Sequence, residues 1–446
     1  MKKVLLFLLL SLLPVSVWAD SNWKAVMRYD KQTAKTDLSN RLQKYAQQSS
    51  HAKAQTTTTP STKEQTAFAK SLVKELKHIG ASKVQLSKTG IVTAEIPATT
   101  SQNMPVIALI AHLDMPPQAQ AQTLQHHAKY TGGDILLNKD TNIALTEQNS
   151  AQLLHAHGHD LITGQGVSAY GVENKAGLSI VMTLADYLLG HTAISHGLIK
   201  IVLLPDAPSL QGANALDISA LGANYALLLK GNDQGEIATS NFSGRSFTVV
   251  LEGNRDIPLG QAIYSNFVDN LLMASDFQTL LPRHFRPETT AGSQGYITVT
   301  DIVTQGNRST ITGQIRAFND TDLQQLSNQV TKAFNTVKAI YPRHTKAQLD
   351  FADQFKNAQN QISPAFIQMV GNALQQEEIL SKQISVRDNT DFAVLTHRGL
   401  PTIGLFTGVF HAGQPLEYAD ADIMESSLRG LITLLTSDWT SLSPVK

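Results

Sequence analysis

Cysteine is absent from the 446-residue chain, so the fold cannot depend on disulfide bonds. Neither sign of charge is in excess: Lys and Arg total 36, as do Asp and Glu, and the charges are scattered along the chain. We therefore expect no electrostatic surface for nucleic acid or for an anionic membrane. Internal repeats and long low-complexity tracts are also missing. What remains is a globular protein, long enough for two or three domains with full cores.

Long apolar runs are rare, but one lies at the start of the chain. Lys2 and Lys3 precede an apolar stretch at residues 4–13, and small residues follow up to Ala19. This three-part pattern is typical of a secretory signal peptide, and the run is well short of the ~20 residues that span a bilayer. With no cysteine for a lipid anchor, we predict a signal peptide at residues 1–19. The mature chain is then periplasmic or secreted and free of the membrane.

Apolar patterning predicts alternating strands and helices through most of the chain. Residues 106–111, 198–204 and 225–229 are near-continuous apolar runs, as strands buried on both faces require. Residues 177–189 form an amphipathic pattern with helical spacing. The fold class predicted is α/β, with a mostly parallel sheet covered by helices.

The alternation of buried strands and helices is interrupted near residue 244 and resumes near residue 358. Between these points the pattern is β-α-β-β-α-β, which describes a self-contained small domain. Its expected elements are residues 246–251, 265–277, 296–303, 310–316, 320–340 and 348–351. We therefore predict an α/β domain at residues 20–243 and 358–446, with an inserted α+β lid domain at residues 244–357.

Polar motifs follow the predicted strands in a recognisable order. They are His112-Leu-Asp114, Gly-Val-Glu-Asn-Lys-Ala-Gly at 171–177, Pro-Asp at 205–206, Gly-Glu-Ile at 235–237, Arg-Asp-Asn-Thr-Asp at 387–391, Phe-Thr-Gly at 406–408, His411 and Glu417. In this order and spacing the chain resembles peptidase T, the tripeptide aminopeptidase of the dizinc exopeptidase family. The resemblance extends from about residue 36 to residue 435.

The resemblance implies two zinc ions at the C-terminal ends of the strands and a lid that closes over a short peptide. It also implies a glutamate that acts as general base toward the metal-bridging water. His112 would ligate one metal, with Asp114 orienting its imidazole. Glu173 falls at the position of the bridging aspartate, although a carboxylate there is equally explained by the start of a helix. His411 keeps the last ligand position, or is a loop histidine.

Three positions depart from the family pattern. Where the family has Asp-Glu-Glu after a strand, this chain has Asp206-Ala207-Pro208, so Ala207 replaces the general base and Pro208 replaces a metal ligand. Lys230 aligns with a further aspartate ligand. A protonated lysine ~5 Å from a dication repels it by about 6–7 kcal/mol at an effective dielectric near 20. We therefore predict no firm cofactor, with zinc bound only if part of the metal site survives.

Two arginines and three histidines are further candidates for site residues. Arg316 and Arg387 match family positions and could bind a peptide carboxylate, or they could form ion pairs at the surface or at the domain interface. His155, His157 and His159 alternate in a loop without a carboxylate partner in register, and we expect them to be solvated.

Two functions remain in competition, besides an unrelated chemistry in the same cleft. The leading hypothesis is an exported, non-hydrolytic peptidase T homologue that binds short peptides or a partner protein, with a homodimer through the lid as a further possibility. The alternative is an active zinc-dependent tripeptide aminopeptidase with a rearranged metal site. If the first holds, we expect the Lys230 ammonium within about 4 Å of a carboxylate of Glu173 or Asp114.

Overall fold

The computed structural model describes residues 29–439 and 442, apart from residues 55, 232, 253–258, 306–307 and 342–345. The predicted signal peptide therefore lies outside the described residues. Within the described ranges, no helix has the length and apolar character needed to cross a membrane.

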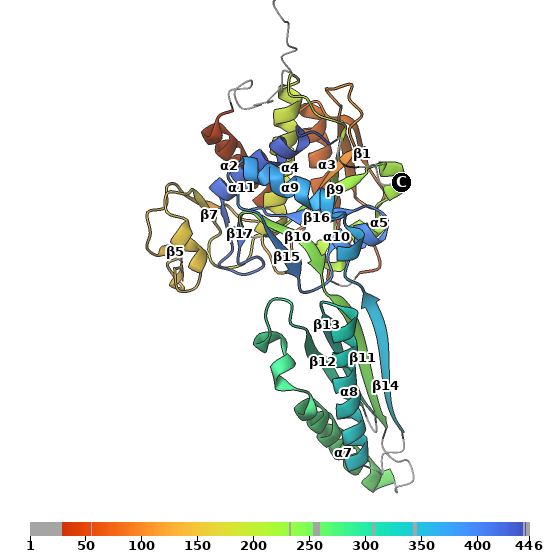
Figure 1. The fold of residues 1–446 in the computed structure, drawn as a ribbon. Coiled ribbons are helices and arrows are strands. Elements are labelled where there is room, and N and C mark those ends of the chain that lie inside the picture. The colour runs from red at the N-terminus through yellow and green to blue at the C-terminus, as the bar shows by residue number, and fades with distance from the viewer. Residues whose placement is uncertain are drawn as a thin grey trace, which may run out of the picture.

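The larger domain contains an eight-stranded, mostly parallel sheet (Figure 1), which confirms the predicted fold class. Its strands, in spatial order, are β1 (Ser82–Leu86), β2 (Val92–Ile96), β8 (Ile199–Leu204), β3 (Ile107–His112), β9 (Tyr225–Leu229), β16 (Thr402–Leu405), β10 (Glu236–Asn241) and β15 (Lys382–Val386). β3 runs parallel to both β8 and β9, so the carboxyl ends of these three strands meet at one edge. All six residues of β3 are buried, as its apolar run predicts.

Helices pack around this sheet. They are α2 (Lys31–Ala46), α3 (Lys63–His78), α4 (Val172–Gly190), α5 (Gln211–Ala215), α6 (Ile218–Leu221), α9 (Pro364–Gln376), α10 (Asp391–His397) and α11 (Ala421–Leu435). α4 contacts β3 and β9, whereas α3 contacts β1 and β2. Gly177 makes the close approach of α4 possible, because a Cβ atom there would lie 2.1 Å from the carbonyl oxygen of Leu229.

A side lobe, residues 125–163, projects from the larger domain (Figure 1). It contains β4 (Gln125–His127), β5 (Ile135–Asn138), β6 (Ile143–Leu145), the short 3-10 helix η1 (Ala151–His155) and β7 (Leu161–Thr163). β4 and β7 form a four-stranded sheet with β17 (Val409–Phe410) and β18 (Tyr418–Asp420), in the order β17-β18-β7-β4. This sheet joins the lobe to the C-terminal part of the chain.

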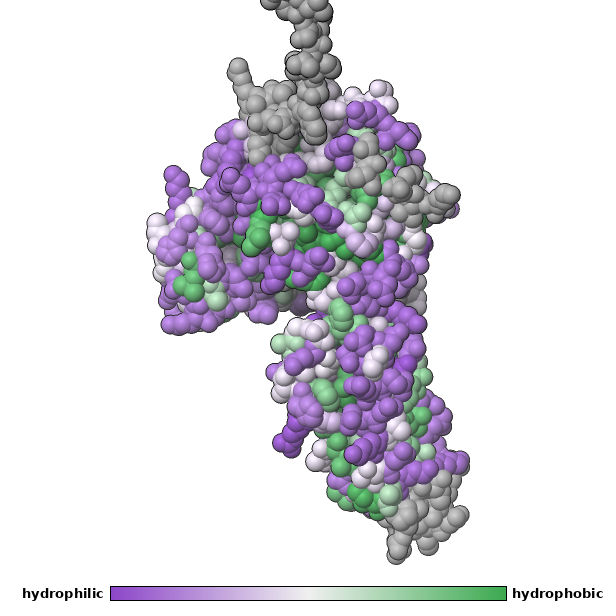
Figure 2. Space-filling view, viewed as in Figure 1, coloured by the Kyte–Doolittle hydropathy of each residue, from purple (hydrophilic) through white to green (hydrophobic). Residues whose placement is uncertain are grey.

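The strands between residues 243 and 355 form a sheet of their own. It is antiparallel, in the order β12 (Tyr296–Gln305), β13 (Arg308–Ala317), β11 (Ser243–Glu252) and β14 (Lys346–Phe355). Helices α7 (Leu259–Leu280) and α8 (Asp320–Ile340) accompany it, and its buried residues form a separate hydrophobic cluster. We refer to residues 243–355 as the lid. It extends away from the larger domain (Figure 1), and Figure 2 shows a hollow between it and the side lobe.

The chain enters and leaves the lid side by side, and two asparagines join the crossings. The buried Asn241 donates from Nδ2 to the carbonyl of Lys356 at 3.2 Å and accepts from the backbone N–H of Ala358 at 2.8 Å. Asn357 donates from its backbone N–H to Ser243 Oγ at 3.1 Å. Short 3-10 helices complete the chain: η2 (Ala207–Ser209), η3 (Arg283–Phe285), η4 (Pro287–Thr289) and η5 (Gln359–Gln361).

Candidate functional site

The predicted site residues gather where three neighbouring strands end. His112 is the last residue of β3, Lys230 directly follows β9, and Ala207 and Pro208 lie in η2, just after β8. Glu173 is the second residue of α4, which begins after the left-handed Gly171 (φ 75°). Ligands of open α/β sheets bind at such carboxyl ends, so the local sequence places these residues where a site is expected.

His112 is fully buried and hydrogen-bonded to a residue that sequence reasoning missed. Its Nε2 lies 3.1 Å from Oδ2 of Asp391, the first residue of α10. Asp114, predicted to orient the imidazole, lies 3.8 Å from Nδ1, which is beyond hydrogen-bond distance. That prediction was wrong in this respect: Asp391 fixes the ring, and Asp114 instead accepts from the backbone N–H of Ala207 at 3.3 Å.

The charged groups around His112 shift one another's pKa values. Burial alone would lower the pKa of His112, but Asp391 outweighs burial and raises it. Burial would likewise raise the pKa of Asp391, yet the charge of His112 keeps that pKa below its ordinary value. For Asp114 burial dominates and raises the pKa to about 6. His112 and Asp391 are therefore joined by a charge-assisted hydrogen bond inside the protein.

The segment after β8 contains a residue with an uncommon backbone conformation and has no ionisable side chain at residues 207 and 208. Asp206 adopts a left-handed conformation (φ 58°, ψ 44°), which is unusual for a residue other than glycine. It is held there by Gln65, which donates from Nε2 at 2.7 Å, and by the backbone N–H of Ser61 at 2.9 Å. The carboxylate of Asp206 is thereby directed toward Ser61 and Gln65. Ala207 is buried and offers only a methyl group, and Pro208 offers no ligand atom.

Lys230 and Glu173 form the ion pair expected for a site without metal. Lys230 Nζ lies 3.7 Å from Glu173 Oε1, and each side chain is 30% exposed. Burial alone would lower the pKa of Lys230, but the charges of Glu173, Asp391 and Asp114 outweigh it and raise the pKa. The lysine is therefore a stable cation next to the carboxylate that the family resemblance assigns to metal bridging.

His411 and Glu417 lie in the loop between β17 and β18. His411 has a positive φ (54°), and its Nε2 is buried without a hydrogen-bond partner among the described residues. Glu417 is fully buried and accepts from the backbone N–H groups of Gly171 at 2.6 Å and Gly413 at 2.8 Å, and also from Tyr170. Burial raises the pKa of Glu417 to about 7 despite these bonds. The carboxyl group thereby attaches the His411 loop to the start of α4.

The two predicted ligand-binding arginines are occupied by contacts between the lid and the larger domain. Arg316, on β13, donates from Nε to Asp388 Oδ1 at 3.0 Å. Arg387, in the loop before α10, donates to the lid residues Thr290 (carbonyl at 2.7 Å, Oγ1 at 2.6 Å) and Gln294 (carbonyl at 3.1 Å). Arg316 thus forms an ion pair between the lid and the larger domain, whereas Arg387 forms hydrogen bonds to neutral acceptors of the lid. The same loop, residues 387–391, reaches from the lid to His112 through Asp391.

The donors at the strand ends do not fit a dizinc centre. His112 Nε2 is committed to Asp391, Lys230 is a cation, and Ala207 and Pro208 supply no ligand atom. A catalytic zinc ordinarily needs three protein ligands, and each of the two implied zinc positions keeps one histidine and shares Glu173. Within the ranges that the structure covers, these residues do not converge as a group of three ligand atoms.

One group of three potential ligands does converge in the described ranges, away from the strand ends. His159, Asp420 and Asp422 present ligand atoms within 4.8 Å of one another. The prediction that His159 is merely solvated was therefore wrong, because its Nδ1 lies 2.7 Å from Asp420 Oδ2. Lys35 already neutralises Asp422, with its Nζ 3.1 Å from Oδ2. The group links α2, the side lobe and α11.

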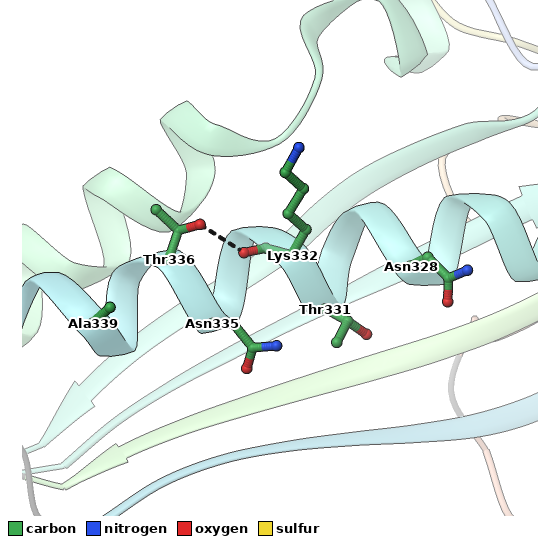
Figure 3. Close-up of a pocket in the computed structure, with 6 residues that line it drawn as sticks. All are labelled: Asn328, Thr331, Lys332, Asn335, Thr336 and Ala339. Carbon is green, nitrogen blue, oxygen red and sulfur yellow. Dashed lines mark hydrogen bonds between the residues drawn. The ribbon is translucent and has the colours of Figure 1, made fainter.

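A groove of about 620 Å³ lies along the outer side of α8 (Figure 3). Its lining is polar and includes Thr336, which donates from Oγ1 to the carbonyl of Lys332 at 2.9 Å. None of the predicted site residues lines it. The groove is therefore a feature of the lid surface and separate from the strand-end site.

Known proteins with a similar sequence include several named peptidase T. No protein-family model matches the chain. Peptidase T of Bacillus licheniformis is 30% identical over 405 residues, which cover 90% of this chain and 98% of that protein. Peptidase T of Clostridium acetobutylicum is 29% identical over 403 residues, with 90% and 98% coverage. The chain belongs to the peptidase T family.

Solved structures of this family and its neighbours share the fold. Aminopeptidase PepT from Bacillus cereus matches with a TM-score of 0.66 at 16% identity, covering 90% of this chain and 98% of that one. A dinuclear metal-binding peptidase of the M20 family from Bacillus subtilis matches with a TM-score of 0.60 at 14% identity, covering 91% and 98%. This peptidase T family member therefore shares the fold of these solved peptidases.

Proposed function

We propose that this peptidase T family member is exported, does not hydrolyse peptides and binds short peptides beside the strand ends. The observation that carries the proposal is the ion pair of Lys230 and Glu173, 3.7 Å apart. An ammonium group at a ligand position opposes a dication and neutralises the carboxylate that would otherwise attract one. The chain supplies its own cation where the family resemblance implies metal.

The lost general base supports the same proposal. Ala207 cannot take a proton from water, and loss of a general base alone typically slows a reaction about 10²–10⁴-fold. Asp206, next in the chain, is held by Ser61 and Gln65 and cannot replace it without breaking those bonds. We propose no catalytic step through zinc at this site.

The second candidate is an active zinc-dependent tripeptide aminopeptidase with a rearranged site. The comparisons favour it, because relatives named peptidase T match over 90% of the chain. It requires a base and metal ligands other than the residues at 207, 208 and 230. Among the predicted site residues, two histidines have a buried ring nitrogen without a hydrogen-bond partner in the described part of the chain, Nε2 of His411 and Nδ1 of His112.

A tripeptidase assay separates the two candidates. The purified mature chain is incubated with triglycine and trileucine in the presence of zinc, cobalt or manganese, and release of the N-terminal amino acid is measured. We expect no hydrolysis above that of an Asp114→Ala variant. Turnover within about a hundredfold of the ~10 s⁻¹ usual for enzymes, abolished by Asp114→Ala, would establish the second candidate.

A further inference from the structure

A cavity of about 360 Å³ lies between α2 and the C-terminal half of α4, and Leu428 of α11 is also part of its lining. Its other lining residues recur at helical spacing on α2 and α4, so one face of each helix forms a wall. Tyr187, in the α4 wall, lies about 21 Å along the helix axis from Glu173 at the start of α4. The cavity is therefore separate from the strand-end site.

Three aspartates line the cavity, and two of them have no cationic partner among the described residues. Asp186 is paired with Arg41, which donates from Nη2 to Asp186 Oδ2 at 2.5 Å. Arg41 also donates from Nε to Glu75 Oε1 at 3.3 Å, so two carboxylates already share its single positive charge. Asp30 and Asp37 lie on the α2 side, and neither forms an ion pair within the described ranges. The lining therefore carries an excess of negative charge.

The end of α4 and the aromatic side chains beside it also favour a cation. α4 ends at Gly190, which lines the cavity, and its last turn contains no basic residue. The carbonyl groups at a helix C-terminus carry the negative end of the helix dipole and attract cations. The rings of Tyr29 and Tyr187 meet edge to face at 5.8 Å, and His191 lies 4.3 Å from Tyr187. Faces of such rings attract ammonium groups within about 6 Å.

We propose that this cavity binds a linear polyamine, with one amino group at Asp30 and another at Asp37. These aspartates are two turns apart on α2, about 10 Å along its axis, so an extended molecule with an amino group at each end can pair with both. Its methylene groups would then lie against the tyrosine rings and Leu428. A single metal ion fits less well, because carboxylates this far apart cannot both ligate one ion. The proposal is independent of peptide binding at the strand ends.

Calorimetric titration of the mature chain with spermidine tests this site. The titration is carried out at low ionic strength, where screening of exposed charges is weak. We expect saturable binding of one spermidine per chain and no binding of octane-1,8-diol, which has a similar length but no charge. Asp37→Asn should weaken spermidine binding about two- to fivefold, the range corresponding to one exposed ion pair. Asp30→Ser should weaken it similarly while keeping a cap for α2.

Asp320→Asn is the matched control. It also removes the charge of one exposed helical aspartate, but on α8 of the lid and outside the cavity. We expect this variant to bind spermidine like the wild type. Equal losses in Asp37→Asn and Asp320→Asn would indicate non-specific attraction and overturn the site. Failure of the wild type to bind spermidine, or unchanged binding in both Asp37→Asn and Asp30→Ser, would also overturn it.

Discussion

Lys230 connects the chemistry of the site to its stability. It replaces a metal ligand in the family pattern and lies 3.7 Å from Glu173, with both side chains 30% exposed. A fully exposed ion pair contributes about 0–1 kcal/mol, whereas removing one partner of a fully buried pair costs about 3–5 kcal/mol. Because this pair is partly exposed, we expect the free energy lost on removing one partner to lie between these limits.

We therefore expect Lys230→Met to lower the free energy of unfolding by about 1–2 kcal/mol, measured by urea denaturation. Lys83→Met is the control, because Lys83 pairs with Glu95 but is 70% exposed, and it should cost less than about 1 kcal/mol. Adding Glu173→Gln to Lys230→Met should recover part of the loss, since it removes the carboxylate left unpaired. Strictly additive effects of the two substitutions would contradict a stabilising pair.

For single residues, the sequence indicates which positions depart from the family pattern. It does not indicate which other residues take over the lost contacts. Ala207, Pro208 and Lys230 are visible because the motifs around them set an expected residue type. Asp391 was missed because it lies 279 residues from His112 in the chain, and the nearby Asp114 satisfied the local pattern. A contact between residues far apart in the chain cannot be predicted from the spacing of neighbouring residues.

Among the elements, α4 and the loop before β18 are linked by a single buried carboxyl group. Glu417 accepts from the backbone at Gly171 and Gly413, so it satisfies N–H groups that a helix start leaves free. Burial raises the pKa of Glu417 to about 7, so the folded protein binds this proton more tightly than the unfolded chain, where glutamate titrates near ~4.3. Its contribution to stability is therefore complete below about pH 4 and is lost as the pH rises through about 7.

Glu417→Gln should flatten this pH dependence. We expect the melting temperature of the wild type to fall more steeply between about pH 5 and 8 than that of the variant, because the amide cannot ionise. The melting temperature is measured by differential scanning calorimetry across this range. Glu64→Gln, a substitution at an exposed first-turn glutamate of α3, serves as control and should keep the wild-type slope. Parallel profiles of wild type and Glu417→Gln would contradict the titration of this group.

Elements with strong local signals were predicted well. β9 (Tyr225–Leu229) and α8 (Asp320–Ile340) have the predicted bounds, because an unbroken apolar run defines the first and a capping Asn319 with amphipathic spacing defines the second. α4 begins five residues before its prediction. Its first turn follows the left-handed Gly171 and includes the buried polar Asn174 and Lys175, which carry no apolar periodicity.

The molecule as a whole consists of two bodies joined by few contacts. The lid has its own core, and it meets the larger domain at the crossings near Asn241 and Asn357 and at loop 387–391. Among the described strands, β12 and β14 are the free edges of the lid sheet, and Phe351 on β14 is 37% exposed. Free strand edges pair readily with another chain.

We predict a homodimer that forms through the lid. Phe351→Lys places a charge on the edge strand and should shift the protein toward monomer in size-exclusion chromatography with light scattering. Leu380→Lys changes a more exposed apolar residue outside the lid (91% exposed) and should leave the mass unchanged. A monomeric wild type, or equal effects of both substitutions, would contradict a dimer through the lid.

The zinc content of the purified mature protein distinguishes a metal-free strand-end site from one that holds metal. Wild type and the Ala207→Glu, Pro208→Glu, Lys230→Asp triple variant are dialysed against the same zinc buffer, and bound metal is measured by elemental analysis. We expect the wild type to retain no stoichiometric zinc, because the ammonium group of Lys230 occupies the position of a metal cation. We expect the triple variant to gain zinc. Two zinc ions per chain in the wild type would contradict it.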